Sequence, residues 1–189
     1  MKSILVIAVN SYREAVRSKI LYTMFVFAII LILAAFFFGT VSIGSQSVVI
    51  QNFGLFAISV FTVAFACISG SSFLFKELKH RTIFTVLSRP VSRWQFIVGK
   101  YLGMLMTVTV MIIIMGAGLS LFVYAIEGAL SHLLVKAYYN IWLELTIICA
   151  AAIFFSSIVV TPLLRGLLTF GIFLAGRSVE YLLYFVKDR

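Results

Sequence analysis

Long apolar segments alternate with short polar ones along the whole chain. The apolar segments cover residues 20–38, 53–75, 96–126 and 141–161, and a fifth segment, residues 166–185, is continuously apolar only to about residue 175. The first holds nineteen residues without a charge. As a helix it extends about 28 Å, enough to cross the hydrocarbon core of a bilayer. The pattern predicts an all-α polytopic membrane protein with about five transmembrane helices, organised as a single transmembrane domain over residues 1–189.

The first nineteen residues are amphipathic rather than uniformly apolar. On a helix, the apolar side consists of Ile4, Leu5, Ala8, Val9, Tyr12 and Val16, and the polar side of Asn10, Arg13, Glu14, Arg17 and Ser18. The apolar run is too short for the core of a signal peptide. We expect residues 1–19 to form an elbow helix on the cytoplasmic membrane surface, with its basic side toward lipid phosphates. The alternative is a frayed, positively charged N-terminus.

The most basic part of the chain separates the second and third apolar segments. Residues 76–100 read KELKHRTIFTVLSRPVSRWQFIVGK and carry six of the fifteen basic residues. Each Lys or Arg in hydrocarbon would cost about 2.5–3.5 kcal/mol, so residues 76–98 are predicted to form an aqueous loop, and their positive charge assigns it to the cytoplasm. Within it we expect a helix from Glu77 to Leu87, a break at Pro90 and a new helix capped by Ser92.

The same loop keeps apolar residues in a segment that faces water. These residues are Ile83, Phe84, Val86 and Leu87. Their presence favours contact with the lipid interface or with a partner protein. The alternative is an ordinary solvated cytoplasmic loop.

The other connections support this orientation. Residues 39–52 are polar and uncharged, and residues 127–140 contain a single basic residue, Lys136, so both are predicted to be outer loops. Eleven basic residues then fall on the cytoplasmic side, against one in these two loops, which also places the N-terminus in the cytoplasm. Aromatic residues are expected to form two belts at the membrane edges, an outer one of Tyr138, Tyr139 and Trp142 and an inner one of Trp94 and Tyr101.

Composition agrees with this class and excludes others. Apolar residues make up 63% and charged residues 11%, with a mean hydropathy of +1.16, whereas soluble domains are about half apolar and a quarter charged. The pI near 9.8 does not indicate a nucleic-acid partner, because the basic residues cluster at predicted membrane edges.

Cys67 and Cys149 lie inside apolar segments and are expected to be buried free thiols. No nucleotide-binding, metalloprotease or serine-hydrolase motif is present, and His80 and His132 fall on opposite predicted sides of the membrane.

Small and charged residues within the apolar segments admit both packing and functional explanations. Gly99 and Gly103 form a GxxxG pair, and Lys100 between them is expected to reach toward head groups. Residues 69–72, Ser-Gly-Ser-Ser, form either a flexible joint or a packing surface. Glu144 is expected about one turn from the outer interface, with its carboxylate reaching water.

The final segment is the most ambiguous part of the chain. Pro162 and Arg165 mark a cytoplasmic turn before it. Arg177 and Glu180 are three residues apart and can pair on one helix face. A full span to Phe185 would bury that pair in the middle of the membrane or place three basic residues on its outer side.

The basic loop resembles a known family. The run HRTIFTVLSRPVSRWQFIVGKYLG is similar to the cytoplasmic loop of ABC-2 type transporter permeases, in the branch that includes the permease of the nitrous-oxide-reductase maturation transporter. The resemblance implies that the loop carries a coupling helix, which docks on a separate ABC ATPase subunit. The docking residues that it implies are Glu77, Arg81, Thr82, Ile83, Phe84, Leu87, Ser88, Arg89, Pro90 and Arg93.

The resemblance also implies an assembly. ATP and Mg²⁺ would sit on the ATPase, with no cofactor on this chain, and a second permease subunit, identical or different, would complete an exporter. Its place would be the cytoplasmic (inner) membrane of a bacterium or archaeon. The family continues for a further span that this sequence lacks, so we expect a truncated product or a natural short variant.

Two other functions remain open. A secondary transporter or channel would carry ionisable residues at mid-membrane. A non-transporting scaffold subunit would have no ATPase partner. The segments have no distinctive polar lining that would indicate a cargo.

Overall fold

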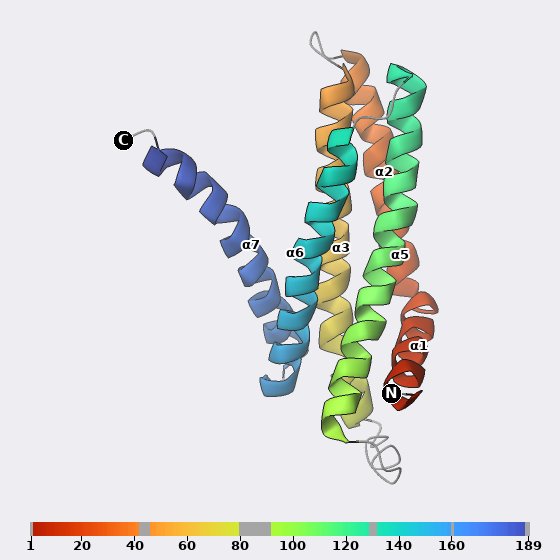
Figure 1. Cartoon of the computed structure of the whole chain (residues 1–189), viewed down its shortest axis with the longest axis vertical. Coiled ribbons are helices and arrows are strands. Elements are labelled where there is room, and N and C mark those ends of the chain that lie inside the picture. Colours follow the sequence, from red (N-terminus) through yellow and green to blue (C-terminus); the bar gives the residue numbers. More distant parts are fainter. Residues whose placement is uncertain (1, 42–45, 80–91, 129–131, 160, 188–189) are drawn as a thin grey trace.

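The computed structural model describes residues 2–41, 46–79, 92–128, 132–159 and 161–187, with side chains for most of them. All regular structure in these ranges is helical, which confirms the predicted all-α class. The helices, labelled in Figure 1, are α1 (Lys2–Val16), α2 (Lys19–Val41), α3 (Gln46–Lys79), α5 (Arg93–Glu127), α6 (His132–Ile158) and α7 (Pro162–Lys187).

Helix α3 is the centre of the bundle. It contacts α2, α5, α6 and α7, and its Ile58, Val63 and Phe65 are buried. Figure 1 shows α2, α3, α5 and α6 running side by side, whereas α7 starts beside the lower end of α6 and diverges from the bundle. Because lipid tails are as apolar as these side chains, close packing and interhelical hydrogen bonds hold such a core together.

Four of the described helices are long and apolar enough to cross a membrane. Their apolar stretches are Val48–Gly70, Trp94–Ile126, Leu133–Ile158 and Pro162–Val179. Helix α2 covers the predicted first apolar segment, residues 20–38. The helices therefore support a multi-pass membrane protein.

The first predicted outer loop is too long. Helix α2 continues to Val41 and α3 begins at Gln46, so most of residues 39–52 are helical. Uncharged polar residues do not end a helix by themselves, since a helix keeps its backbone hydrogen bonds satisfied where it leaves the hydrocarbon.

The second predicted outer loop is also too long. Helix α6 begins at His132, which leaves only residues 128–131 between it and α5. Gly128 ends α5 in the left-handed conformation at φ 70°, and its N–H donates to the Tyr124 carbonyl at 2.9 Å. This is the usual glycine-terminated helix end, because glycine lacks the Cβ that disfavours that conformation.

Arg165 closes the turn between α6 and α7. Its Nε donates to the Val159 carbonyl, and its Nη1 lies 3.3 Å from the Ser156 hydroxyl. The side chain is buried although it carries a charge. The predicted turn is present, with Pro162 as the first residue of α7, and Arg165 holds it by capping carbonyls that the end of α6 leaves unpaired.

Aromatic side chains of α6 direct their polar atoms toward α5. The Tyr138 hydroxyl donates to the Gly116 carbonyl at 3.1 Å and lies 3.1 Å from the Ser120 hydroxyl. The Trp142 indole N–H donates to the Thr109 hydroxyl at 3.0 Å. The predicted outer belt is therefore wrong for Tyr138 and Trp142, because their polar atoms satisfy interhelical bonds instead of reaching head groups.

The predicted inner belt divides in the same way. The Tyr101 hydroxyl of α5 donates to the Thr146 carbonyl of α6 at 3.3 Å. Trp94, in contrast, is 73% exposed, as expected at a membrane edge. Tyr139 is also exposed, so one residue of each predicted belt faces outward.

Gly70 gives residues 69–72 a packing role. Helix α3 is continuous through this segment. A Cβ at Gly70 would lie 2.7 Å from the Ala152 Cβ of α6 and 3.4 Å from the Met104 Cε of α5. A small residue here therefore lets three helices approach one another, which favours the packing explanation over the flexible joint.

We expect Tyr138→Phe to lower the free energy of unfolding by about 0.5–1.5 kcal/mol, the usual contribution of one hydrogen bond. The change removes only the hydroxyl that binds α5. Thermal unfolding in detergent measures it. Tyr139→Phe is the matched control, because the neighbouring hydroxyl lies on an exposed side chain. Equal effects of the two changes would contradict the assigned role of Tyr138.

Candidate functional site

The predicted docking loop connects α3 and α5 at one end of the bundle. Figure 1 shows that the C-terminal end of α3, the N-terminal end of α5 and α1 lie together there. Glu77 belongs to the last turns of α3, and Arg93 is the first residue of α5, but neither side chain is described. The other predicted docking residues lie outside the described residues; they are Arg81, Thr82, Ile83, Phe84, Leu87, Ser88, Arg89 and Pro90.

Ser92 begins α5, as the sequence predicts. It occupies the N-cap position with φ −68° and ψ 146°, and its carbonyl accepts a hydrogen bond from the Phe96 N–H at 3.2 Å. Its side chain makes no capping hydrogen bond. The position of the helix start is therefore confirmed, whereas the expected hydroxyl cap is not formed.

Helix α1 packs against the first turns of α5 through the GxxxG pair. A Cβ at Gly99 would lie 2.8 Å from the Ile7 Cβ. A Cβ at Gly103 would lie 2.6 Å from the Ser11 Cβ and 2.7 Å from the Ala8 carbonyl oxygen. The two helices thus run in the same direction, with backbones close enough to exclude any side chain at either glycine. The loop leads directly into a helix that is firmly attached to α1.

A charged side chain is enclosed in the same contact. The Lys100 side chain is 6% exposed, and its Nζ lies 3.9 Å from Oε2 of Glu14 on α1. The ammonium also lies 5.7 Å from the centre of the Phe96 ring. Lys100 therefore does not extend toward head groups as expected. It is paired within the protein, between the Glu14 carboxylate and the Phe96 ring.

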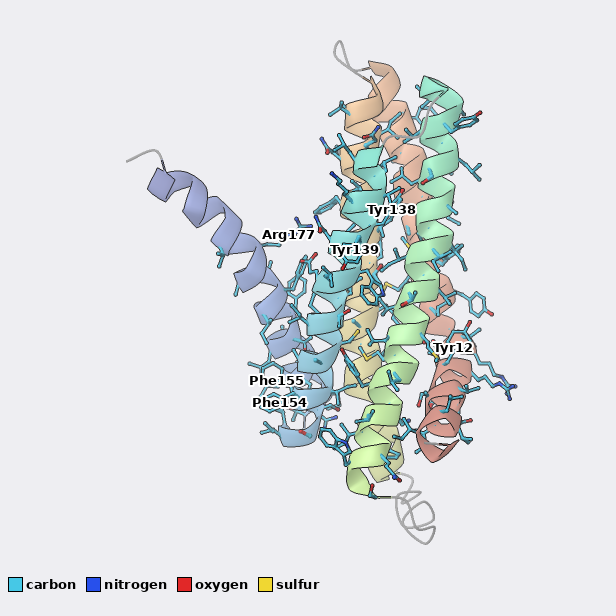
Figure 2. All side chains as sticks on the ribbon, viewed as in Figure 1. Tyr12, Tyr138, Tyr139, Phe154, Phe155 and Arg177 are labelled. Carbon is cyan, nitrogen blue, oxygen red and sulfur yellow. The ribbon has the colours of Figure 1, made fainter. Side chains whose placement is uncertain are left out.

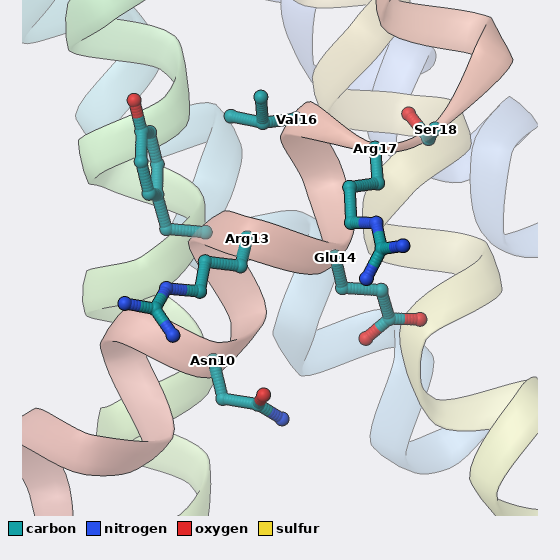
Figure 3. A pocket seen from close by; sticks show the side chains of 7 residues that line it. Asn10, Arg13, Glu14, Val16, Arg17 and Ser18 are labelled. Atoms are coloured by element: carbon teal, nitrogen blue, oxygen red, sulfur yellow. The ribbon is translucent and has the colours of Figure 1, made fainter.

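Side chains of α1 and the two residues after it, Glu14 among them, line an open hollow of about 710 Å³. Figure 3 shows the side chains of Asn10, Arg13, Glu14 and Arg17 around it. Arg13 and Arg17 are exposed and one helical turn apart. This polar side is the one predicted to face lipid phosphates, and that role stays a prediction.

A second polar cluster lies between α7 and the bundle. The sequence pattern did not indicate that its residues lie together. Arg177 Nε lies 3.9 Å from Oε1 of Glu144 on α6, and Arg177 Nη2 donates to the Ser59 hydroxyl of α3 at 3.4 Å. We call these three residues the Arg177 cluster; Figure 2 shows Arg177 where α7 faces α6. Arg177 was expected to pair with Glu180, whose side chain is not described.

Glu144 lies farther from the start of its apolar helical stretch than predicted. It lies in the span Leu133–Ile158, eleven residues from its start, or about 16 Å along a helix. The expectation of one turn from the interface failed because α6 starts earlier than the apolar pattern indicated. Its first residues, such as Lys136 and Asn140, are polar but helical.

These observations define a helical, multi-pass membrane protein. Among known protein families, residues 5–177 match the ABC-2 family transporter proteins. Since the match covers most of the sequence, the chain belongs to this family. It is a permease component of an ABC transporter, a membrane subunit of the kind that associates with an ABC ATPase. Comparison with curated proteins finds no match.

We expect Gly103→Ala to destabilise the protein by about 1–3 kcal/mol, the usual cost of overpacking. The added methyl would meet the Ala8 backbone, which cannot rotate away as a side chain can. Thermal unfolding in detergent measures the loss. Gly118→Ala in the same helix is the control, because nothing lies within 4 Å of a Cβ there; it should be neutral or stabilising by up to about 1 kcal/mol. A harmless Gly103→Ala would contradict the described contact.

Proposed function

We propose that the chain is the membrane-spanning permease subunit of an ATP-driven exporter and that a separate ATPase subunit drives it. The proposal rests on the family match together with the position of the basic loop. This loop joins α3 to α5, the helix against which α1 packs closely. The proposed location is the cytoplasmic membrane of a bacterium or archaeon, with the N-terminus inside.

The proposed docking surface is the loop of residues 76–98. Ile83, Phe84 and Leu87 would provide apolar contacts to the ATPase, because apolar residues in an aqueous loop favour a protein partner. Ionic and hydrogen-bonding contacts would come from the polar docking residues, and Pro90 would fix the corner before α5. ATP and Mg²⁺ would bind to the ATPase, since this sequence has no phosphate-binding loop.

Movement of the loop would reach the membrane through α1 and α5. The GxxxG contact and the pair of Lys100 with Glu14 support the proposal that these helices move as one body. A second permease subunit, identical or different, would complete the pathway. The loop's resemblance to the permease of the nitrous-oxide-reductase maturation transporter supports placing the chain in that branch.

One observation favours a second candidate, a secondary transporter or channel that works without ATP. Arg177 and Glu144 provide the intramembrane ionisable pair that such a function predicts. The two candidates differ in whether cargo movement in proteoliposomes requires the ATPase and ATP.

We expect Phe84→Asp or Leu87→Asp to abolish co-purification of the ATPase from native membranes, because a carboxylate would be desolvated in an apolar contact. Insertion should be unchanged, since the loop lies in water. Mass spectrometry of the tagged chain and its companions measures the association.

Thr85→Asp is the control for this experiment. It places the same charge in the same loop without removing an apolar contact, and it should retain the ATPase. Retention by all three variants would refute the docking surface. Absence of any ATPase from the wild-type complex would refute the proposed function itself.

A further inference from the structure

Ser59 and Glu144 of the Arg177 cluster lie near the middle of the apolar stretches of α3 and α6. Ser59 follows the start of its span, Val48, by eleven residues, the same interval that separates Glu144 from Leu133. At about 1.5 Å per residue each lies about 16 Å from the span's start, near the centre of a hydrocarbon core about 30 Å thick. Charges at this depth are costly and mark functional positions more often than structural ones.

The polar groups of the Arg177 cluster are farther apart than tightly hydrogen-bonded groups. Charge-assisted hydrogen bonds between guanidinium and carboxylate are about 2.7–2.9 Å long, whereas Arg177 lies 3.9 Å from Glu144 and 3.4 Å from Ser59. The side chains of Arg177 and Glu144 are 44% and 31% exposed. A guanidinium has five N–H donors in a planar fork, so this arrangement leaves it able to receive a further acceptor.

The surroundings of the cluster are apolar. The Phe173 ring lies 5.9 Å from the guanidinium carbon. Phe170, Leu174 and Val179 of α7 are exposed on either side of Arg177 along the helix. Lipid tails cannot supply an acceptor to Arg177, whereas a molecule with one acidic group and an apolar remainder satisfies both surfaces.

We propose that the Arg177 cluster binds the acidic head group, a phosphate or carboxylate, of an amphipathic molecule that enters from the lipid between α6 and α7. Arg177 forms the bidentate contact, which its planar fork favours over a lysine. Ser59 supplies a hydroxyl on the side of the bundle, and Glu144 is the counter-ion of Arg177 before the ligand binds. The inference rests on the proposed function and gives it a class of cargo.

The test uses the purified full chain in dodecyl maltoside with dodecyl phosphate as the probe, and native mass spectrometry counts the bound molecules. Arg177→Gln should weaken binding at least tenfold, and Arg177→Lys should weaken it less. Glu144→Gln should tighten binding severalfold, because it removes a competing carboxylate. A purely structural ion pair predicts the opposite sign for Glu144→Gln.

Two controls distinguish binding at the Arg177 cluster from binding at other basic side chains and from simple anion binding. The double change Arg13→Gln and Arg17→Gln removes the basic side chains of the α1 hollow and should leave the Arg177-dependent binding intact. Inorganic phosphate, which has no apolar chain, should bind far more weakly than dodecyl phosphate; equal affinity would overturn the amphipathic ligand and leave a simple anion site.

Two results would overturn the proposal outright. The first is equal binding of dodecyl phosphate by wild type and Arg177→Gln. The second is weaker binding of dodecyl phosphate by Glu144→Gln, accompanied by a lower unfolding temperature of that variant. Arg177→Gln should still co-purify with the ATPase, so failure of this site is distinguishable from failure of the proposed function.

Discussion

The close approach of α1 to α5 is the contact on which the end of the structure near the basic loop depends. Two glycines one turn apart remove the side chains that would hold the helices apart, and the backbones then meet through Ala8 and Ser11. This proximity encloses Lys100 beside Glu14, so a charge that would otherwise seek water is paired within the protein. The basic loop joins α5 just before this contact, so the α1–α5 pair is directly connected to the loop.

The rest of the bundle is built by a different rule. Hydroxyl and indole groups of Tyr101, Tyr138 and Trp142 join α5 to α6, because polar atoms inside a membrane are satisfied by neighbouring helices. Helix α7 packs differently from α5 and α6. It leaves the bundle with most of its described apolar side chains exposed. Its polar contacts include the Arg165 bonds at the end of α6 and the longer contacts of Arg177 with α3 and α6.

The apolar pattern predicted which segments are helical, because an uncharged run of this length has few alternatives. It did not predict where the helices end. Gly128 was the available signal for the end of α5, and Ser131, a favoured N-cap residue type, was the available signal for the start of α6 at His132. That error also misplaced Glu144 and hid its pairing with Arg177, since contacts between distant segments depend on helix register. The GxxxG pair was visible in the sequence, but its partner on α1 was not. The docking residues of the loop remain a prediction, because residues 80–91 lie outside the described part.

The most direct test of the central claim measures distances during the ATPase cycle. Spin labels at Arg13 on α1 and Leu102 on α5, both exposed positions, report whether these helices move as one body. A second pair, at Leu102 and Val179, reports movement between α5 and α7. In the complex with its ATPase, the Arg13–Leu102 distance should be the same without nucleotide and with trapped ATP, while the Leu102–Val179 distance changes. A shift in the Arg13–Leu102 distance on trapping ATP would contradict the account.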